Sequence, residues 1–190
     1  LAVGYLIGLA RQSYLIDREV RAGRWPKPAG ISLSGKTAAV VGLGDIGRNV
    51  VRRLLAADMK VLGYDPGITQ EQAPVSCALK KWPEGIEDAD FLVLTCALTQ
   101  SSYHMVNQEV FMGTKPGVRL INVSRGPIVD ERSLIKALET GQVHSAALDV
   151  FEEEPLASDN PLRDHERCIF GSHNASNTVD AVHRTSRLAI

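Results

Sequence analysis

From residue 37 onward, short apolar runs alternate with stretches of helical periodicity. The helical stretches cover residues 46–58 and 130–141, and the second one ends at Gly141. The apolar runs, each short enough to be a strand, span residues 37–44, 59–65, 91–97, 119–124, 144–150 and 168–172. Apolar strands that alternate with helices predict a parallel sheet covered on both faces, which is a doubly wound α/β fold.

The first 22 residues carry a different pattern. The apolar stretch LAVGYLIGLA has ten residues, whereas a membrane-spanning helix needs about 20, and it lacks the basic start of a signal peptide. We therefore expect one buried helix that ends near Gly23 and Pro26. Its apolar face is formed by Leu6, Leu9, Ala10 and Ile16, with Tyr14 beside it.

Three other segments have weaker signals. Residues 23–35 contain much of the early proline and glycine and are expected to link the first helix to the main domain. Residues 66–88 show little periodicity and are expected to be rich in loops. Residues 99–111 form a polar segment between two strands.

The chain divides into three parts on these signals. We assign residues 1–30 to a first helix and linker, residues 31–176 to the main domain, and residues 177–190 to the start of a C-terminal helix. Ser176 or Asn177 is the expected N-cap of that helix. Because the sequence opens on a leucine inside a helical pattern, we expect it to be a piece of a longer protein.

Composition and charge narrow the class of protein. The 190 residues are 44% hydrophobic and 23% charged, with a net charge of −1 and no basic stripe, so we expect a globular domain that does not bind nucleic acid. The three cysteines, Cys77, Cys96 and Cys168, are scattered and lack CxxC spacing. This pattern argues against a disulfide framework or a metal site and favours the reducing cytoplasm.

A glycine-rich turn follows the first predicted strand. Gly42, Gly44 and Gly47 have GxGxxG spacing and precede a helix, which is typical of a Rossmann-type dinucleotide-binding turn. The first glycine allows the tight turn, the second lets the backbone approach a pyrophosphate, and the third lets helix and strand pack closely. The phosphates are expected to bind the free N–H groups of Asp45 and Ile46 at the helix start.

An acidic residue ends the second predicted strand. Asp65 lies about 20 residues beyond the turn, where a carboxylate accepts hydrogen bonds from the adenosine ribose. Because a carboxylate repels a 2′-phosphate, NAD is favoured over NADP. The Asp45 carboxylate lies awkwardly close to the expected phosphates, and we expect it to point to solvent, toward Arg48.

Polar residues follow the later strands. Arg125, Asp149 and His173 each come at or just after the end of a predicted strand, and ligands of this fold bind outside the carboxyl ends of strands. An arginine at that edge can bind a carboxylate with two hydrogen bonds. The other histidines have ordinary interpretations as surface or interior residues; they are His104, His144, His165 and His183.

Four sequence blocks resemble one family in order and spacing. GLGDIG, NVSRGPIVDERSLIKAL, LDVFEEEPL and SHNASNT are similar to the blocks of the D-isomer-specific 2-hydroxyacid dehydrogenases, which include phosphoglycerate, glycerate and D-lactate dehydrogenases. The resemblance covers essentially the whole chain. It implies a single NAD-binding domain of an oxidoreductase, with the family's substrate domain missing, and a 2-hydroxy or 2-keto acid as the substrate.

The resemblance also implies roles for individual residues. Arg125 would bind the carboxylate and carbonyl of the substrate, and His173 would be the general acid/base. Glu154, the last of three glutamates, would hydrogen-bond His173, while Glu152 and Glu153 are expected to be a solvated turn. The nicotinamide would lie near Asp149 and near the backbone of Cys96, Ala97, Val123 and Ser124. The cofactor site would also include Arg125, His173 and Asn174.

The resemblance has departures and alternatives. Ser172 stands before the histidine where many members have proline. Without a substrate domain, we expect these 190 residues to bind NAD but to turn over slowly or not at all. A dehydrogenase-like NAD sensor of the corepressor type remains the alternative, while an adenosylhomocysteine hydrolase does not fit the NVSRG and LDVFEEEP blocks. Members of the family usually dimerise through this domain, so a homodimer is expected.

Overall fold

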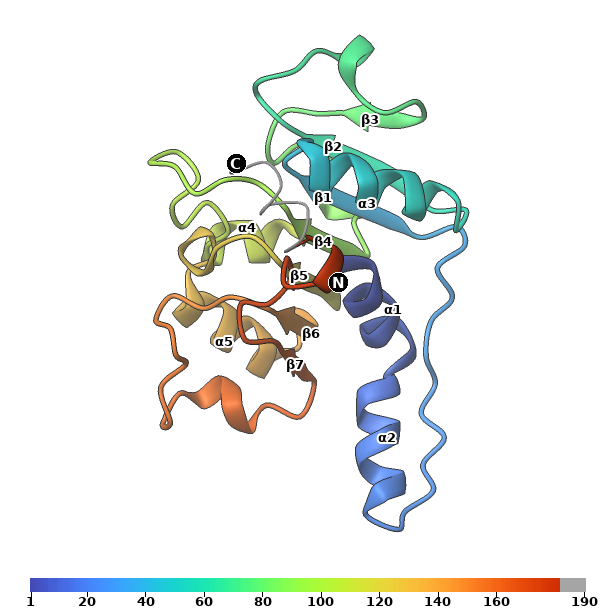
Figure 1. Ribbon diagram of the computed structural model, residues 1–190, viewed down its shortest axis with the longest axis vertical. Helices are drawn as coiled ribbons and strands as arrows, with labels where there is room; N and C mark the ends of the chain where they lie inside the picture. Colours follow the sequence, from blue (N-terminus) through green and yellow to red (C-terminus); the bar gives the residue numbers. More distant parts are fainter. Residues whose placement is uncertain (182–190) are drawn as a thin grey trace.

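A computed structural model describes residues 1–181 as one parallel seven-stranded sheet with helices on both faces (Figure 1). The strand order is β3-β2-β1-β4-β5-β6-β7, and every neighbouring pair is parallel. The strands are β1 Thr37–Val41, β2 Lys60–Tyr64, β3 Cys77–Leu79, β4 Phe91–Leu94, β5 Val118–Asn122, β6 Val143–Leu148 and β7 Cys168–Phe170. The predicted doubly wound α/β fold is confirmed.

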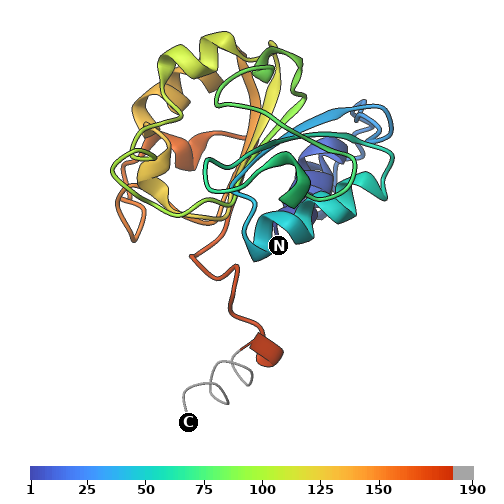
Figure 2. The ribbon, with the colours of Figure 1, turned by 90° about the horizontal axis from the view of Figure 1, so that it is seen from above.

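Helices cover the sheet in two layers (Figures 1 and 2). On one face, α1 and α3 pack on the sheet through leucines such as Leu6 and Leu54, and on the other face α4 and α5 pack through Phe111 and Leu138. The α-helices are α1 Ala2–Arg11, α2 Ser13–Arg21, α3 Asp45–Leu55, α4 Gln108–Gly113 and α5 Glu131–Thr140. Each face therefore has its own hydrophobic core.

The central strands are mostly apolar on both of their faces, because both faces are covered, and β4 is apolar at every position. In β5, for example, Leu120 packs into the core under α4 and α5, while Ile121 packs into the core under α1 and α3. Both side chains are fully buried. This is why the sequence shows continuous apolar runs rather than an alternation of apolar and polar residues.

The strand order places a switch point between β1 and β4. The chain runs outward from β1 to β2 and β3, and then returns to β4 on the other side of β1 before it continues to β7. At such a point the loops after the strands diverge and leave a crevice outside the carboxyl ends. The carboxyl edge of the sheet is therefore where this fold positions a ligand.

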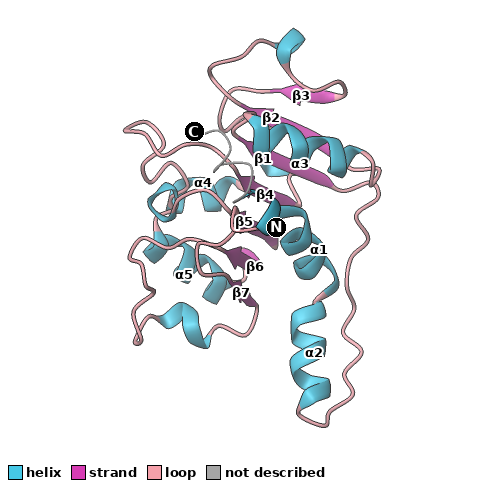
Figure 3. Ribbon diagram, viewed as in Figure 1, coloured by secondary structure: helices cyan, strands magenta, loops and turns pink. Residues whose placement is uncertain are grey.

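The predicted single helix at the N-terminus is wrong. The helix breaks at Gln12, whose φ of 51° lies in the left-handed region, and it continues as α2, which has no buried residue. The side-chain amide of Gln12 donates a hydrogen bond to the Ala29 carbonyl (3.1 Å) in the returning segment, a long-range contact that local periodicity does not reveal. Residues 24–32 contain no helix or strand and run back alongside α2 (Figure 3).

The structure adds to two other expectations and corrects a third. The segment 66–88, expected to be rich in loops, also contains the edge strand β3, which is too short at three residues to show a strand pattern. The polar segment 99–111 contains the start of α4. The C-terminal helix has Thr178 as its N-cap, whose hydroxyl accepts a hydrogen bond from the Ala181 N–H (3.1 Å), and neither Ser176 nor Asn177 caps it.

Residues 182–190, which hold most of the expected C-terminal helix and His183, lie outside the described residues. Within residues 1–181, no helix is both long enough and apolar enough to cross a membrane.

Candidate functional site

The glycine turn between β1 and α3 has the geometry that its spacing predicts. Gly42 has a φ of 89°, and a Cβ there would lie 2.5 Å from backbone atoms of Cys96. A Cβ on Gly47 would lie 1.8 Å from the Gly42 carbonyl oxygen. A Cβ on Gly44, by contrast, would meet no atom within 4 Å, so this side of the turn is open to a ligand. Two glycines therefore serve close packing, and the third leaves space.

The start of α3 faces the same open space. Gly44 is the N-cap, so the N–H groups of Asp45 and Ile46 belong to the first turn, where no intrahelical acceptor exists. Free N–H groups and the helix dipole favour an anion at this point. Together with the uncovered Gly44, they fit the pyrophosphate of a dinucleotide. The expected pairing of Asp45 with Arg48 is not formed, because the Arg48 guanidinium donates to the Gln72 carbonyl (2.6 Å).

The carboxylate of Asp65 lies at the end of β2, beside the glycine turn. Its Oδ2 accepts a hydrogen bond from the Leu43 N–H (2.8 Å), and its Oδ1 accepts one from the Gly67 N–H (2.9 Å). Each carboxylate oxygen has two lone pairs, so both oxygens keep acceptor capacity. Asp65 is therefore held in place by backbone groups and can still accept hydrogen bonds from hydroxyl groups.

A pocket of about 630 Å³ lies between α1, α3 and the carboxyl edge of the sheet. It brings together six of the residues that the sequence assigns to the cofactor or to catalysis: Asp45, Ile46, Val123, Arg125, Asp149 and His173. The other predicted cofactor residues do not line this pocket; they are Gly42, Gly44, Gly47, Asp65, Cys96, Ala97, Ser124 and Asn174. Among them, Cys96 packs against Gly42 on the switch-point side, next to the turn.

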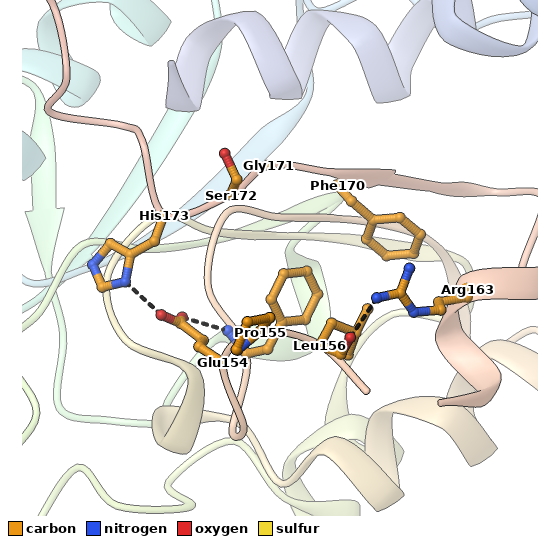
Figure 4. A pocket seen from close by; sticks show the side chains of 9 residues that line it. Glu154, Pro155, Leu156, Arg163, Phe170, Gly171, Ser172 and His173 are labelled. Carbon is orange, nitrogen blue, oxygen red and sulfur yellow. Dashed lines mark hydrogen bonds and ion pairs between the residues drawn. The ribbon is translucent and has the colours of Figure 1, made fainter. Parts of the chain in front are cut away.

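Glu154 and His173 form a pair, as predicted, although 18 residues separate them in the chain. The His173 Nδ1 lies 2.7 Å from Glu154 Oε2, and Glu154 Oε1 accepts a hydrogen bond from the Phe151 N–H (3.0 Å) (Figure 4). His173 itself has a φ of 56°, a left-handed conformation that directs the ring toward the carboxylate. The pair also borders a second pocket, of about 510 Å³, walled by Phe151 and Phe170.

The carboxyl of Glu154 is stabilised in its ionised form. Partial burial raises its pKa, but hydrogen bonds from His173 and from the Phe151 N–H, with the charges of His173 and Arg125, outweigh that effect. The net pKa lies below the ordinary value of 4.5. An ionised carboxylate can only accept hydrogen bonds, so His173 Nδ1 carries the proton between them and Nε2 is the free ring nitrogen.

Glu152 is exposed, as predicted, and its carboxylate also contacts two other segments of the chain. Glu152 Oε1 lies 2.9 Å from His104 Nε2 and accepts a hydrogen bond from the Glu131 N–H (2.8 Å) at the start of α5. His104, predicted to be an ordinary residue, is therefore part of a contact between two loops, and the carboxylate of Asp130 lies within 4.8 Å of this pair. Glu153 is exposed, as predicted.

Asp149 accepts hydrogen bonds from three backbone N–H groups of the loop that carries His173, which the sequence does not reveal. Its side chain is only 1% exposed, and its two oxygens accept hydrogen bonds from the N–H groups of Asn174 (3.2 Å) and Ala175 (2.8 Å). Its carbonyl accepts a hydrogen bond from the His173 N–H (2.7 Å). Asp149 lines the larger pocket and also fixes the loop that carries His173.

Three residues that hold the site together were missed by sequence analysis. Asn122 is buried at the end of β5, and its side chain bonds the segment that leads to Arg125. A Cβ on Gly126 would lie 1.7 Å from the Phe151 carbonyl oxygen, so only glycine lets these two loops touch. A Cβ on Gly171 would lie 2.0 Å from Asp149 Oδ1. The NVSRG block contained the signal for Asn122 and Gly126.

Comparisons with known proteins agree with this geometry. The family model for "D-isomer specific 2-hydroxyacid dehydrogenase, NAD binding domain" matches residues 3–175. D-3-phosphoglycerate dehydrogenase of Rattus norvegicus is 40% identical over 190 residues, which cover 97% of this chain and 35% of the rat protein. A crystal structure of a glyoxylate reductase from Paecilomyes thermophila superposes with a TM-score of 0.91 at 30% identity and covers 98% of this chain and 57% of that one.

A third relative carries a nucleotide. A probable 2-hydroxyacid dehydrogenase from Rhizobium etli, described in complex with NADP, superposes with a TM-score of 0.84 at 26% identity. It is matched over 98% of this chain and 61% of its own. The chain thus spans less than two thirds of each of these three proteins. The match to the family model, which covers nearly all of the described residues, shows that this chain belongs to the D-isomer specific 2-hydroxyacid dehydrogenase family, as its NAD-binding domain.

Proposed function

We propose that this domain serves an NAD-dependent oxidoreductase that transfers a hydride between NAD and C2 of a D-2-hydroxy acid or the corresponding 2-keto acid. The observation that carries the proposal is the Glu154–His173 pair (2.7 Å), whose histidine lines the same pocket as Arg125. A base with a fixed partner next to an arginine is what the oxidation of a hydroxy acid requires. Bound NAD supplies the hydride acceptor or donor.

Arg125 is proposed to bind the substrate. Its guanidinium lies at the carboxyl edge of β5, and Nη1 donates one hydrogen bond to the Ser124 carbonyl (2.7 Å). The side chain is exposed to the pocket and offers further donors, which can bind the carboxylate and the C2 oxygen of a 2-keto acid. This arrangement would place C2 between the arginine and the histidine ring.

His173 is proposed to move the proton. Because Nδ1 faces the Glu154 carboxylate, Nε2 is the nitrogen that takes the hydroxyl proton during oxidation and returns it during reduction. Glu154 holds the ring in one tautomer and stabilises the charged imidazolium that forms when Nε2 is protonated. The low pKa of Glu154 supports this role, because the carboxylate stays ionised at neutral pH.

We also propose that the cofactor is NAD rather than NADP, that the protein is a homodimer, and that it works in the cytoplasm. Asp65 beside the glycine turn supports the first statement. The second is supported by α2, which extends from the sheet with no buried residue. The three unpaired cysteines support the third.

The proposed function is tested in two steps. First, the 190-residue chain is titrated with NADH while fluorescence is followed; saturable binding is expected. Second, the longest natural form of the protein is assayed for NADH oxidation with a panel of 2-keto acids: glyoxylate, pyruvate and hydroxypyruvate. The variant His173→Gln should lose about 10²–10⁴-fold in kcat and should keep its affinity for NADH.

Two outcomes would overturn the proposal. If the wild-type protein binds NADH but reduces none of a broad set of 2-keto acids, an NAD-sensing role becomes the better interpretation. If His173→Gln retains wild-type turnover, the proton is carried by another group. We also predict that the 190 residues alone are slow or inactive. Saturable reduction of a 2-keto acid by this chain would contradict that prediction.

A further inference from the structure

Asn122 lies where β5 gives way to the loop that carries Arg125. It is the last residue of the strand, paired in register with Leu94 of β4 and Leu148 of β6, and only 1% of it is exposed. On this loop the site residues that the sequence identifies, Val123, Ser124 and Arg125, lie after this point, and Asn122 does not line the pocket. A buried amide at the end of a central strand needs partners, since an unpaired polar group there is costly.

The Asn122 side chain binds both neighbours on the loop. Its Oδ1 accepts hydrogen bonds from the Ser124 N–H (3.0 Å) and the Ser124 hydroxyl (2.9 Å), and its Nδ2 donates to the Arg125 carbonyl (3.0 Å). The amide thus holds both Ser124 and Arg125 against the end of β5. The amide supplies an acceptor and a donor on two separate atoms of one short side chain, whereas an ionised aspartate offers only acceptors and leucine offers neither, so neither of them can make both contacts.

The backbone of Asn122 continues the network toward His173. The Asn122 carbonyl accepts a hydrogen bond from the Asp149 N–H (2.9 Å), and the Asp149 carbonyl accepts one from the His173 N–H (2.7 Å). These bonds form an unbroken path from the backbone of Arg125 to the backbone of His173. The residue at its centre sets the spacing between the two side chains that are proposed to hold and react with the substrate.

We infer that Asn122 is a positioning residue of the reaction, which fixes the backbone of Arg125 relative to His173. This inference rests on the proposed function. Asn122 touches neither substrate nor cofactor and acts through the Arg125 carbonyl. Its loss should therefore weaken the handling of the 2-keto acid and leave the nucleotide turn, which lies on the far side of the switch point, unchanged.

Asn122→Asp separates the two halves of the contact. The aspartate keeps the acceptor for Ser124 but replaces the donor with an oxygen that repels the Arg125 carbonyl. Ser145→Ala is the matched control, because it removes the hydroxyl of a fully buried polar residue in the neighbouring strand β6, which lies 3.1 Å from His144 Nδ1, and leaves the bonds of Asn122 to Ser124 and Arg125 intact. Both changes are buried and polar, so a general loss of packing would affect both.

The measurements are made on the longest natural form of the protein. We expect Asn122→Asp to lower kcat/KM for the keto acid at least about tenfold, the equivalent of one lost hydrogen bond at the upper end of its usual contribution. The KM for the keto acid should rise, while the Kd for NADH stays within about twofold of wild type. Ser145→Ala should change kcat/KM by less than about threefold.

Three results would overturn the inference or redirect it. Equal losses in the two variants would mean that Asn122 is an ordinary polar core residue. A parallel loss of NADH binding would also mean a general structural role. If Asn122→Asp does not fold, Asn122→Ser, which keeps a short donor and acceptor, must retain more activity than Asn122→Ala. Absence of turnover in the wild type would instead reject the proposed function, so the two failures are distinguishable.

Discussion

The two halves of the carboxyl edge are built in different ways. On the β1 side, the nucleotide turn is made almost entirely of backbone from a single stretch, residues 42–47. On the β5–β7 side, the site is made of side chains from three strand ends, joined by contacts such as Glu154–His173. The first half depends on the absence of side chains at its glycines, which lets backbone segments pack closely and leaves space for a ligand. The second depends on hydrogen bonds between loops that are far apart in the sequence.

This difference determines how each half responds to mutation. The nucleotide turn has almost no room for a side chain at Gly42 and Gly47, where a methyl group would meet backbone atoms. At Gly44 a methyl group would meet no protein atom within 4 Å. The half after β5 to β7, which carries Arg125, Glu154 and His173 and is proposed to be catalytic, is called the catalytic half below. We expect it to keep its fold when one polar group is lost, because several hydrogen bonds hold its loops. Substitutions in the first half should therefore lower the stability of the fold or the affinity for the nucleotide. Substitutions in the second half should lower the turnover rate.

The largest expected effect is that of Gly47→Ala. The new Cβ would lie 1.8 Å from the Gly42 carbonyl oxygen, and neither backbone can move without breaking the contact between β1 and α3. We expect a loss of about 3 kcal/mol in the free energy of unfolding, at the upper end of the usual range for overpacking. Urea unfolding measures it.

Gly44→Ala is the control for that substitution. Its Cβ would meet no atom within 4 Å, and its φ of −71° is open to alanine, so the fold should be unaffected. NADH affinity should fall about tenfold, because the methyl group occupies space reserved for the phosphates. If Gly44→Ala destabilises the protein as much as Gly47→Ala does, the contrast between packing and binding glycines is wrong.

Next in size is Glu154→Gln, which tests the catalytic half. The amide keeps the shape of the side chain and loses the negative charge that faces His173 Nδ1. We expect kcat for 2-keto acid reduction to fall about 10-fold to 100-fold, less than for the loss of His173 itself. NADH affinity should not change, because the nucleotide turn lies elsewhere on the edge. A loss in NADH binding without a loss in kcat would reverse the assignment of the two halves.

The sequence predicted the nucleotide half better than the catalytic half for the same reason. The GxGxxG spacing and Asp65 are local signals, and the strands around them are long apolar runs. Arg125, Glu154 and His173 came from a family resemblance, and no periodicity could have paired Glu154 with His173. Asp149 acts through contacts over 25 residues or more, such as its bond from the Asn174 N–H, and these become visible only once the strands are side by side.

The errors at the N-terminus have a similar origin. The break at Gln12 contains neither glycine nor proline, and the contact that accompanies it comes from Ala29. Likewise, β3 has only three residues and owes its place to pairing with β2. Local sequence specifies the strongly apolar elements, whereas short or interrupted elements depend on what they touch.

Asp65→Ala tests whether the nucleotide half selects NAD over NADP. Removing the carboxylate also removes the repulsion of a 2′-phosphate. The dissociation constant for NADPH divided by that for NADH should therefore fall about tenfold. The measurement is a parallel fluorescence titration with both nucleotides. Because Asp65 also accepts hydrogen bonds from the Leu43 and Gly67 N–H groups, Asp65→Asn is needed beside it. An unchanged ratio in both variants would mean that Asp65 only shapes the turn.

The smallest expected effect comes from the opposite, amino edge of the sheet and separates stability from catalysis. Burial and then the charges of Arg119 and Arg167 lower the pKa of His144 from 6.5 to about 4. A histidine with a depressed pKa is neutral in the folded protein while the unfolded chain takes up a proton, so stability present above pH 6.5 is lost as the pH falls toward 4. After allowance for its partial exposure, the loss should be about 1 kcal/mol.

His144→Asn should flatten this part of the stability profile, measured by urea unfolding at several pH values between about 7 and 4.5. His165, whose pKa is also lowered by burial, should leave a smaller residual slope in the same range. The depressed pKa values of Asp90 and Glu154 act only at lower pH, because their ordinary values are 3.8 and 4.5. If His144→Asn instead alters the pH dependence of kcat, the amino edge is coupled to the catalytic half, and the separation of the two edges fails.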